Sequence, residues 1–167
     1  MSFTARAAHI GDAAAIATIY NEGIADRIAT FETEPRSSED ITGWFDGRHP
    51  IVVVEHNGVV IAFASSSSYR SRDCYAGIAE FSVYVARRQR GTGAGRVAMA
   101  ALTEAAKAAG FWKLVSRVFP ENVASLALMA RMGFREVGTY QRHGKLDGQW
   151  RDCVIVELLF ADATPQT

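Results

Sequence analysis

The chain has 167 residues, of which 49% are hydrophobic and 22% are charged, a composition typical of a soluble globular protein with a buried core. Its 18 basic and 18 acidic residues give zero net charge, which excludes bulk electrostatic capture of nucleic acid or of an anionic membrane. Any anion site must therefore be local. The length predicts a single domain over residues 1–160, followed by a polar tail over residues 161–167.

The start of the chain and its cysteines indicate the compartment. The opening segment MSFTARAAHIGD lacks the charged start and apolar run of a signal peptide, and no stretch of about 18 apolar residues predicts a membrane span. We therefore expect a cytoplasmic protein with reduced thiols. Cys74 and Cys153 lie far apart without metal-type spacing, and a disulfide between them stays open. The histidines show no ligand spacing, so no metal is predicted.

Two helices are predicted near the N-terminus. Apolar residues recur at helical spacing over residues 13–26, and Asp12 is placed to cap that helix. Ser37 and Asp40 resemble a capping box that opens a second helix within residues 38–48. A short alternating strand is expected before the first helix, over residues 3–8, and a loop between the helices, over residues 27–35.

The centre and the C-terminal part predict a sheet with two further helices. Asn57-Gly58 suits the type I′ turn of a hairpin, and Gly110 and Gly133 mark helix ends. The resulting order of elements predicts an α/β fold with a mostly antiparallel sheet. The expected strands are 51–56, 59–69, 80–86, 111–119, 135–143 and 152–160; the helices are 95–109 and a short one within 121–134; a loop covers 70–77 and a turn 145–148.

The segment RRQRGTGAG, residues 87–95, joins a predicted strand to a predicted helix. Unpaired amides and the dipole at a helix N-terminus favour an anion, and glycine lets a ligand approach the backbone closely. Arg90 and Arg96 add positive charge. A P-loop is excluded because Arg96-Val97 follows Gly95, and the dinucleotide fingerprint fails because Arg96 replaces its third glycine. A plain turn remains the alternative on these residues alone.

Two segments resemble the GNAT superfamily of N-acetyltransferases, which use acetyl-coenzyme A. Residues 90–95, RGTGAG, match its R/Q-x-x-G-x-G/A signature, and ENVASLALMARMGF is similar to its N-x-x-S-x-x-L-x-x-x-x-GF segment. The element order is also similar, so the likeness covers almost the whole chain and implies the GNAT acyl-CoA N-acyltransferase fold. The residues that it implies for coenzyme binding are Val83, Tyr84, Val85, Arg90, Gly91, Thr92, Gly93, Ala94, Gly95, Arg96, Asn122 and Ser125.

Three stretches resemble a narrower group, the phosphinothricin acetyltransferases and their relatives acting on methionine sulfone, methionine sulfoximine or arsinothricin. EFSVYV resembles E-x-[ST]-V-Y-V, and YRSRDCY resembles W-[KR]-x-R-x-x-Y, whose basic residues meet the anionic groups of the substrate. GTYQRHGKLDGQWRDCV resembles the pattern G-x-x-K-x-G-x-W-x-D. The residues implied for substrate binding are Phe31, Arg70, Ser71, Arg72 and Tyr75.

Glu80 is the predicted catalytic base. A carboxylate can take the proton of the substrate ammonium directly or through one water; the alternative is a surface residue at a strand start. Where the phosphinothricin group carries histidine, and many GNAT enzymes tyrosine, this chain has Met129, which cannot donate a proton. Met129 is predicted to pack in the core. The departing coenzyme A thiolate could take a proton from water or from Tyr140, or it could leave without one, and the sequence does not decide among these three.

The resemblance implies N-acetylation of the α-amino group of a small anionic amino acid. It also implies a homodimer in which Phe31 reaches the neighbour's site, and no nucleic-acid or membrane partner. Two alternatives stay open: acetylation of a protein N-terminus or lysine, and a regulatory module that binds the coenzyme without catalysis. The basic segment YRSRD favours a compact anionic substrate, and Glu80 favours catalysis.

Overall fold

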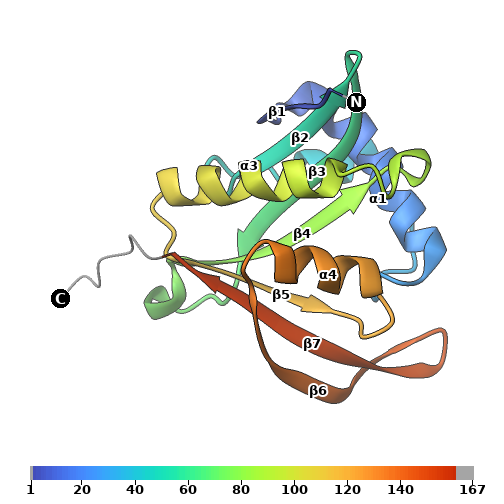
Figure 1. The fold of residues 1–167 in the computed structure, drawn as a ribbon, viewed down its shortest axis with the longest axis vertical. Helices are drawn as coiled ribbons and strands as arrows, with labels where there is room; N and C mark the ends of the chain where they lie inside the picture. The colour runs from blue at the N-terminus through green and yellow to red at the C-terminus, as the bar shows by residue number, and fades with distance from the viewer. Residues whose placement is uncertain (1, 161–167) are drawn as a thin grey trace.

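The computed structural model describes residues 2–160, which form a seven-stranded sheet of order β1-β2-β3-β4-β5-β7-β6 (Figure 1). Neighbouring strands are antiparallel except β4 and β5, so the predicted α/β fold with a mostly antiparallel sheet is confirmed. The predicted tail, residues 161–167, lies outside the described residues. The strands are β1 (Thr4–Ala7), β2 (Ile51–His56), β3 (Val59–Ser68), β4 (Ile78–Val85), β5 (Lys113–Val118), β6 (Arg135–Leu146) and β7 (Gln149–Leu159); the α-helices are α1 (Ala13–Asp26), α2 (Ser38–Thr42), α3 (Ala94–Ala108) and α4 (Val123–Arg131).

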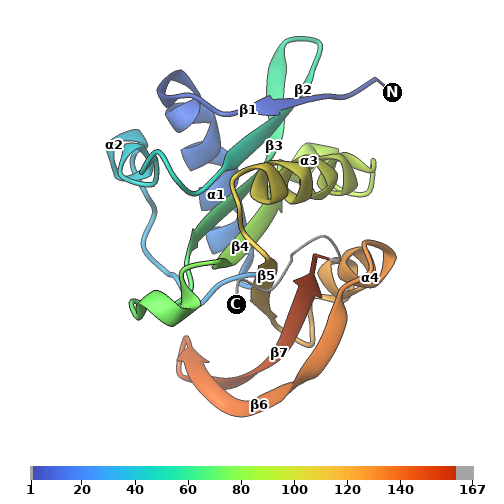
Figure 2. The same cartoon turned by 90° about the vertical axis from the view of Figure 1, so that its left-hand side faces the viewer.

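Helices cover both faces of the sheet. Figure 2 shows α1 and α2 on one side of the strands, and α3 and α4 on the other. Because successive side chains of a strand point to opposite faces, Val52 and Val54 of β2 pack in the cluster around α3, whereas Val53 packs in the cluster around α1. This burial on both faces explains why the first four residues of β2, 51–54, are an apolar run rather than an alternating pattern.

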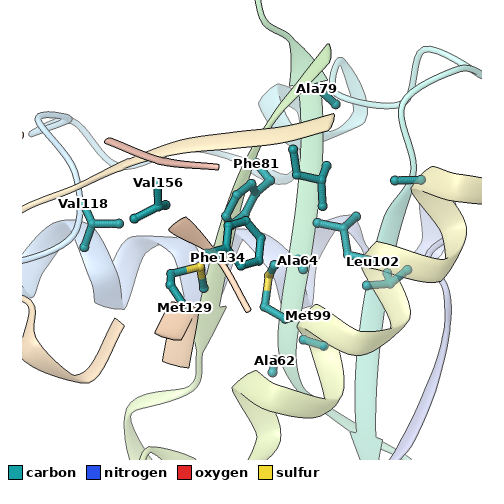
Figure 3. Packing of buried hydrophobic residues seen from close by; sticks show 14 of the residues in the cluster. Ala62, Ala64, Ala79, Phe81, Met99, Leu102, Val118, Met129, Phe134 and Val156 are labelled. Carbon is teal, nitrogen blue, oxygen red and sulfur yellow. The ribbon is translucent and has the colours of Figure 1, made fainter. Parts of the chain in front are cut away.

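The larger core cluster lies on the side of α3 and α4 (Figure 3). Met99 and Leu102 of α3 are fully buried there, and Phe81 of β4 is 3% exposed. The Phe81 ring packs against Phe134, just after α4, with ring centroids 5.2 Å apart. Met129 is 2% exposed in the same cluster, so its predicted role in core packing is confirmed. These contacts join α4 to the middle of the sheet.

Two-residue turns fix both long hairpins. Asn57 and Gly58 have φ of 52° and 77°, which confirms the predicted turn between β2 and β3. Asp147 and Gly148 repeat this geometry, with φ of 50° and 77°. The predicted turn over residues 145–148 was therefore too long: the last two strands pair up to Leu146 and Gln149, and both extend several residues beyond their predicted ends.

The two N-terminal helices differ from prediction at their ends. The capping box of α2 is confirmed, because the Asp40 amide donates to Ser37 Oγ at 3.1 Å and the Ser37 amide donates to Asp40 Oδ2 at 2.8 Å. The helix nevertheless ends at Thr42, so the expectation of a helix within residues 38–48 held only for its first turn. Asp12 precedes α1 but does not cap it with its side chain.

The carboxylate of Asp12 is instead buried and pairs with Arg6, whose side chain is partly exposed. It accepts two hydrogen bonds of 2.8 Å from Arg6 and one of 2.9 Å from the His9 amide, and Asp12 is only 5% exposed. The Arg6 hydrogen bonds hold the pKa of Asp12 below its ordinary value of 3.8. A charge buried at this level is stable only while it is paired. The pair ties the end of β1 to the start of α1.

We expect Asp12→Asn to lower the free energy of unfolding by about 2 kcal/mol at neutral pH, because it removes charged hydrogen bonds. Since the pKa of folded Asp12 is depressed, this contribution is complete above the ordinary pKa and is lost as pH falls through the folded value. Urea unfolding at pH 6 and at successively lower pH tests this. A wild-type advantage over the variant that stayed constant below pH ~3.5 would contradict the pairing.

Within residues 2–160, no helix is long and apolar enough to cross a bilayer. Cys74 is exposed and Cys153 is buried, and neither forms a disulfide. The disulfide that the sequence left open is therefore not formed in this structure.

Candidate active site

The sheet opens between its two parallel strands. Pairing of β4 with β5 covers three residue pairs, from Ile78–Lys113 to Glu80–Val115. One residue further, the hydroxyl of Ser116 donates to the Phe81 carbonyl at 2.8 Å, and this buried bond bridges the strands where the ladder ends. Beyond it, β4 no longer pairs with β5, and the Val85 carbonyl at the end of β4 accepts a hydrogen bond of 3.4 Å from Arg90 Nε.

The segment of residues 87–95, the glycine turn, lies at the end of β4. Gly91 and Gly93 have φ of 77° and 91°, a left-handed conformation that other residues rarely adopt, and α3 begins at Ala94. The first backbone bond of the helix runs from the Val97 amide to the Gly93 carbonyl at 3.2 Å. Among the described residues, no backbone carbonyl accepts a hydrogen bond from the amides of residues 93–96. The turn therefore presents a row of free N–H groups at a helix N-terminus, which is an anion site.

A cavity of about 410 Å³ lies between this turn, the open edge of β4 and α4. Ten of the twelve residues predicted for coenzyme binding line it: Val83, Tyr84, Val85, Arg90, Gly91, Gly93, Gly95, Arg96, Asn122 and Ser125. The other two point elsewhere. The Thr92 hydroxyl donates to the Gln89 carbonyl at 2.6 Å, and Ala94 is 1% exposed in the core.

Sequence reasoning named none of the other lining residues singly, although it placed the segment of residues 121–134 beside the coenzyme. Gly23, Ile28 and Ala29 come from the end of α1 and the following loop, and no local motif connects them to the glycine turn. Arg131 lies in the last turn of α4. It adds a third arginine beside Arg90 and Arg96, and one basic residue at a helix end gives no sequence signal of its own.

Two predicted coenzyme ligands are partly engaged within the protein. Arg90 Nη1 donates to Asp26 Oδ2 at 2.6 Å, and Arg87 pairs with the same carboxylate at 2.8 Å. Hydrogen bonds from Arg87, with a further contribution from Arg90, lower the pKa of Asp26. The side-chain oxygen of Asn122 accepts from the Ser125 amide at 3.2 Å and so caps α4. Arg90 therefore holds the loop against α1 as well as facing the cavity.

Glu80 lines a smaller pocket, of about 120 Å³. Its Oε1 accepts from Arg117 Nη2 at 2.9 Å, and its side chain is 26% exposed. A narrow cavity of about 40 Å³ shares Phe81, Ser82 and Tyr84 with this pocket, and Val83, Tyr84 and Ser125 with the large one. The three cavities follow the opening of the sheet and lead from the glycine turn to Glu80.

Phe31 is in the pocket of its own chain. Its ring packs edge-on against Phe119, with centroids 4.8 Å apart, and lines the pocket of Glu80. A Cβ atom on Gly144 of β6 would lie 2.8 Å from the ring, so the glycine makes room for it. The expectation that Phe31 lies near the substrate agrees with this placement, and its reach into a neighbour's site stays a prediction.

The predicted basic clamp is not brought to Glu80. Arg70, Ser71 and Arg72 are exposed on the loop between β3 and β4 and line none of the cavities described above. The Arg70 guanidinium lies 4.5 Å from the centre of the Tyr69 ring, which in turn packs against Tyr75 at 5.9 Å. The loop is thus a separate cationic and aromatic surface at the far end of β4.

Of the proton sources that the sequence left open, water, Tyr140 or none, the structure bears on Tyr140. Met129 lines the narrow cavity but has no proton to donate. Tyr140 is 52% exposed on β6 and lines none of these cavities, so it is not positioned to serve. Tyr84 lines all three, but burial raises the pKa of its hydroxyl, which makes it a weaker acid. Within residues 2–160, no group of three His, Cys, Asp or Glu residues is arranged to hold a metal ion.

The cavity fits a long ligand with a diphosphate, because it offers free amides, flanking arginines and an open strand edge. The nearby carboxylate of Glu80 fits the transfer of an acyl group to an amine, which must first lose a proton. The fold and the site thus define the class of coenzyme A-dependent acyltransferases. Within that class, the chain belongs to the acetyltransferase (GNAT) family, whose model matches residues 16–134. Enzymes of this family use acetyl-coenzyme A as the acetyl donor.

Relatives of known or assigned activity cover nearly the whole chain. An L-methionine sulfoximine/L-methionine sulfone acetyltransferase of Pseudomonas paraeruginosa is 33% identical over 95% of both chains. A phosphinothricin N-acetyltransferase of Streptomyces coelicolor is 33% identical over 83% of this chain and 85% of its own. Among solved structures, a phosphinothricin acetyltransferase of Sinorhizobium meliloti in complex with acetyl-coenzyme A superposes with a TM-score of 0.91, at 28% identity, over 100% of this chain and 93% of its own.

Proposed function

We propose that this chain transfers the acetyl group of acetyl-coenzyme A to the α-amino group of a small amino acid such as methionine sulfoximine, methionine sulfone, phosphinothricin or arsinothricin. The observation that carries the proposal is the line of cavities from the glycine turn to Glu80. The pocket of about 120 Å³ suits an amino acid rather than a peptide chain. The activities of the relatives from Pseudomonas and Streptomyces support the substrate class.

In this proposal, the glycine turn holds the diphosphate of the coenzyme. The amides of residues 91–96 donate to its oxygens, Arg96 adds charge, and the open edge from Val83 to Val85 pairs with the pantetheine arm. Asn122 and Ser125 line the opposite wall. When bound, the coenzyme supplies an acetyl thioester, which is the electrophile of the reaction. The protein has to bring an uncharged amine to it.

Glu80 is the proposed general base. The amine arrives as an ammonium ion and must lose a proton before it can attack. Glu80 is partly buried in the pocket next to the open end of the sheet, within reach of a substrate that enters beside Phe31. No residue is assigned to protonate the thiolate, because a thiolate is a stable leaving group and Met129 cannot act as an acid.

Arg70 and Arg72 are proposed to bind the side-chain phosphinate of the amino acid, with Ser71 and Tyr75 beside them, on the resemblance of their segment. Because these residues line none of the three cavities, the substrate must extend from the Glu80 pocket to this loop. We expect Arg72→Ala to lower kcat/KM for phosphinothricin by about tenfold, because it removes a charged hydrogen bond that solvent exposure weakens. The KM for acetyl-coenzyme A should not change. Steady-state kinetics with both substrates tests this. If a neutral amine without anionic groups were acetylated as well as phosphinothricin, the anion-binding loop would be refuted.

The proposal includes a cytoplasmic homodimer with no nucleic-acid or membrane partner. Resistance to an antibiotic or herbicide is one role that such an acetylation could have. Light scattering of the purified protein measures the oligomeric state, and a monomer at enzymatic concentrations would rule out the dimer.

Release of coenzyme A with a panel of acceptors tests the function as a whole. We expect acetylation of methionine sulfone, methionine sulfoximine and phosphinothricin, and little turnover of lysine-containing or N-terminal peptides. Preference for a peptide would replace the proposal with protein acetylation. Tight coenzyme binding without turnover of any acceptor would indicate a regulatory module.

A further inference from the structure

The charges next to the open end of the sheet come from two side chains. Among the described residues, Glu80 and Arg117 are the charged residues that line the 120 Å³ pocket, and Arg117 is the charged residue of the narrow cavity that leads to the coenzyme side. Their side chains are 26% and 50% exposed. The pair therefore faces a cavity that a ligand can enter and is not sealed in the core.

The strand geometry explains how Arg117 reaches Glu80. Val115 of β5 pairs with Glu80 in parallel register, and Arg117 lies two residues further on the same face of the strand. There the pairing of β4 with β5 has ended, so the guanidinium extends into the opening. Within residues 2–160, the Arg117 side chain donates hydrogen bonds to Glu80 alone. A guanidinium has five N–H donors, which leaves several for a ligand.

The chemistry of an amino acid requires a cation at this place. The α-amine and the α-carboxylate share one carbon atom, so an amine within reach of Glu80 brings a second carboxylate within a few ångströms of it. Two carboxylates at that separation repel each other strongly in a partly desolvated pocket. Arg70 and Arg72 are exposed on the loop beyond β3 and do not line the pocket. Arg117 is the cation in position.

We propose that Arg117 binds the α-carboxylate of the substrate and so selects free amino acids over amines that lack it. This assignment rests on the proposed function. The planar guanidinium matches a carboxylate with two parallel hydrogen bonds. Arg117 then lies between Glu80 and the substrate carboxylate, where it screens the two negative charges and orients the amine toward Glu80. The loop arginines remain free to bind the side-chain group at the other end of the substrate.

Methionine sulfone and its α-carboxamide test the assignment. The sulfone group is uncharged, so the two compounds differ in the one group that Arg117 would bind. We expect the wild type to prefer the acid in kcat/KM, and Arg117→Gln to reduce that preference at least tenfold. Arg117→Lys, which keeps the charge without the planar fork, should retain part of it. The lower basicity of the carboxamide amine affects every variant alike and cancels when preferences are compared.

Arg135→Gln is the matched control. Arg135 is a strand arginine that pairs with Glu157 at 2.7 Å and lines none of the three cavities along the opening, so both substrates should keep their wild-type kcat/KM. Calorimetric titration of each variant with coenzyme A checks the fold, and Arg117→Lys carries the test if Arg117→Gln does not fold. If Arg117→Gln slowed both substrates equally, Arg117 would only position Glu80, and the assignment would be wrong. If the wild type acetylated neither compound nor any other amino acid, the proposed function itself would fail.

Discussion

Glu80→Gln is expected to lower kcat by roughly 100-fold or more near neutral pH, because glutamine keeps the shape of the side chain but cannot accept the ammonium proton. Part of the activity should return at high pH, where solvent already removes the proton from more of the amine. The measurement is a pH–rate profile of the variant beside the wild type, with saturating acetyl-coenzyme A. The amide can still accept a hydrogen bond from Arg117, so the local structure should persist.

Glu157→Gln is the control for this substitution. Glu157 is also a partly buried strand glutamate, with a side chain 19% exposed, and it pairs with Lys113 at 2.9 Å and Arg135 at 2.7 Å. It lines none of the cavities along the opening, so its kcat should stay within about threefold of wild type. Equal rates for Glu80→Gln and wild type across the pH range would mean that Glu80 is a structural carboxylate.

The sequence predicted most of the fold because its signals are local. Asn57-Gly58 and the capping box at Ser37 act within a few residues, and both are present as expected. The errors occurred where a local signal was recognised but the length of the turn or strand was wrong. Asp147-Gly148 is a two-residue turn of the same kind as Asn57-Gly58, but β6 before it is largely exposed and β7 begins with exposed residues, and both strands were predicted too short.

The lining of the 410 Å³ cavity was predictable for a similar reason. The glycine turn and Asn122 belong to two short segments with recognisable spacing, and both line the cavity. The acceptor side depends on contacts far apart in the chain. Nothing local indicates that Arg117 pairs with Glu80, 37 residues earlier, because this follows from the parallel register of β4 and β5. Arg70 and Arg72 resembled a motif, and the fold of this chain leaves them outside the pocket.

A substitution in the glycine turn should have a similarly large effect on the KM for acetyl-coenzyme A. We expect Gly93→Val to raise the KM for acetyl-coenzyme A by about 100-fold while the KM for the amino acid changes little. Gly93 has φ of 91° and an added Cβ would meet no protein atom within 4 Å, so the side chain would occupy the space at the cavity rather than collide with the protein. Losing two charged hydrogen bonds from the free amides, at about 1.5 kcal/mol each, accounts for that factor.

Backbone strain must be separated from loss of the ligand, because valine at positive φ destabilises the fold by about 1–3 kcal/mol wherever it is placed. Gly110→Val provides that comparison. Gly110 has φ of 89°, its added Cβ also meets nothing within 4 Å, and it lies at the opposite end of α3, outside the cavity. Both variants should lose similar stability in urea unfolding, but only Gly93→Val should lose coenzyme affinity. Equal coenzyme KM values for the two variants would show that the amides of the glycine turn do not hold the diphosphate.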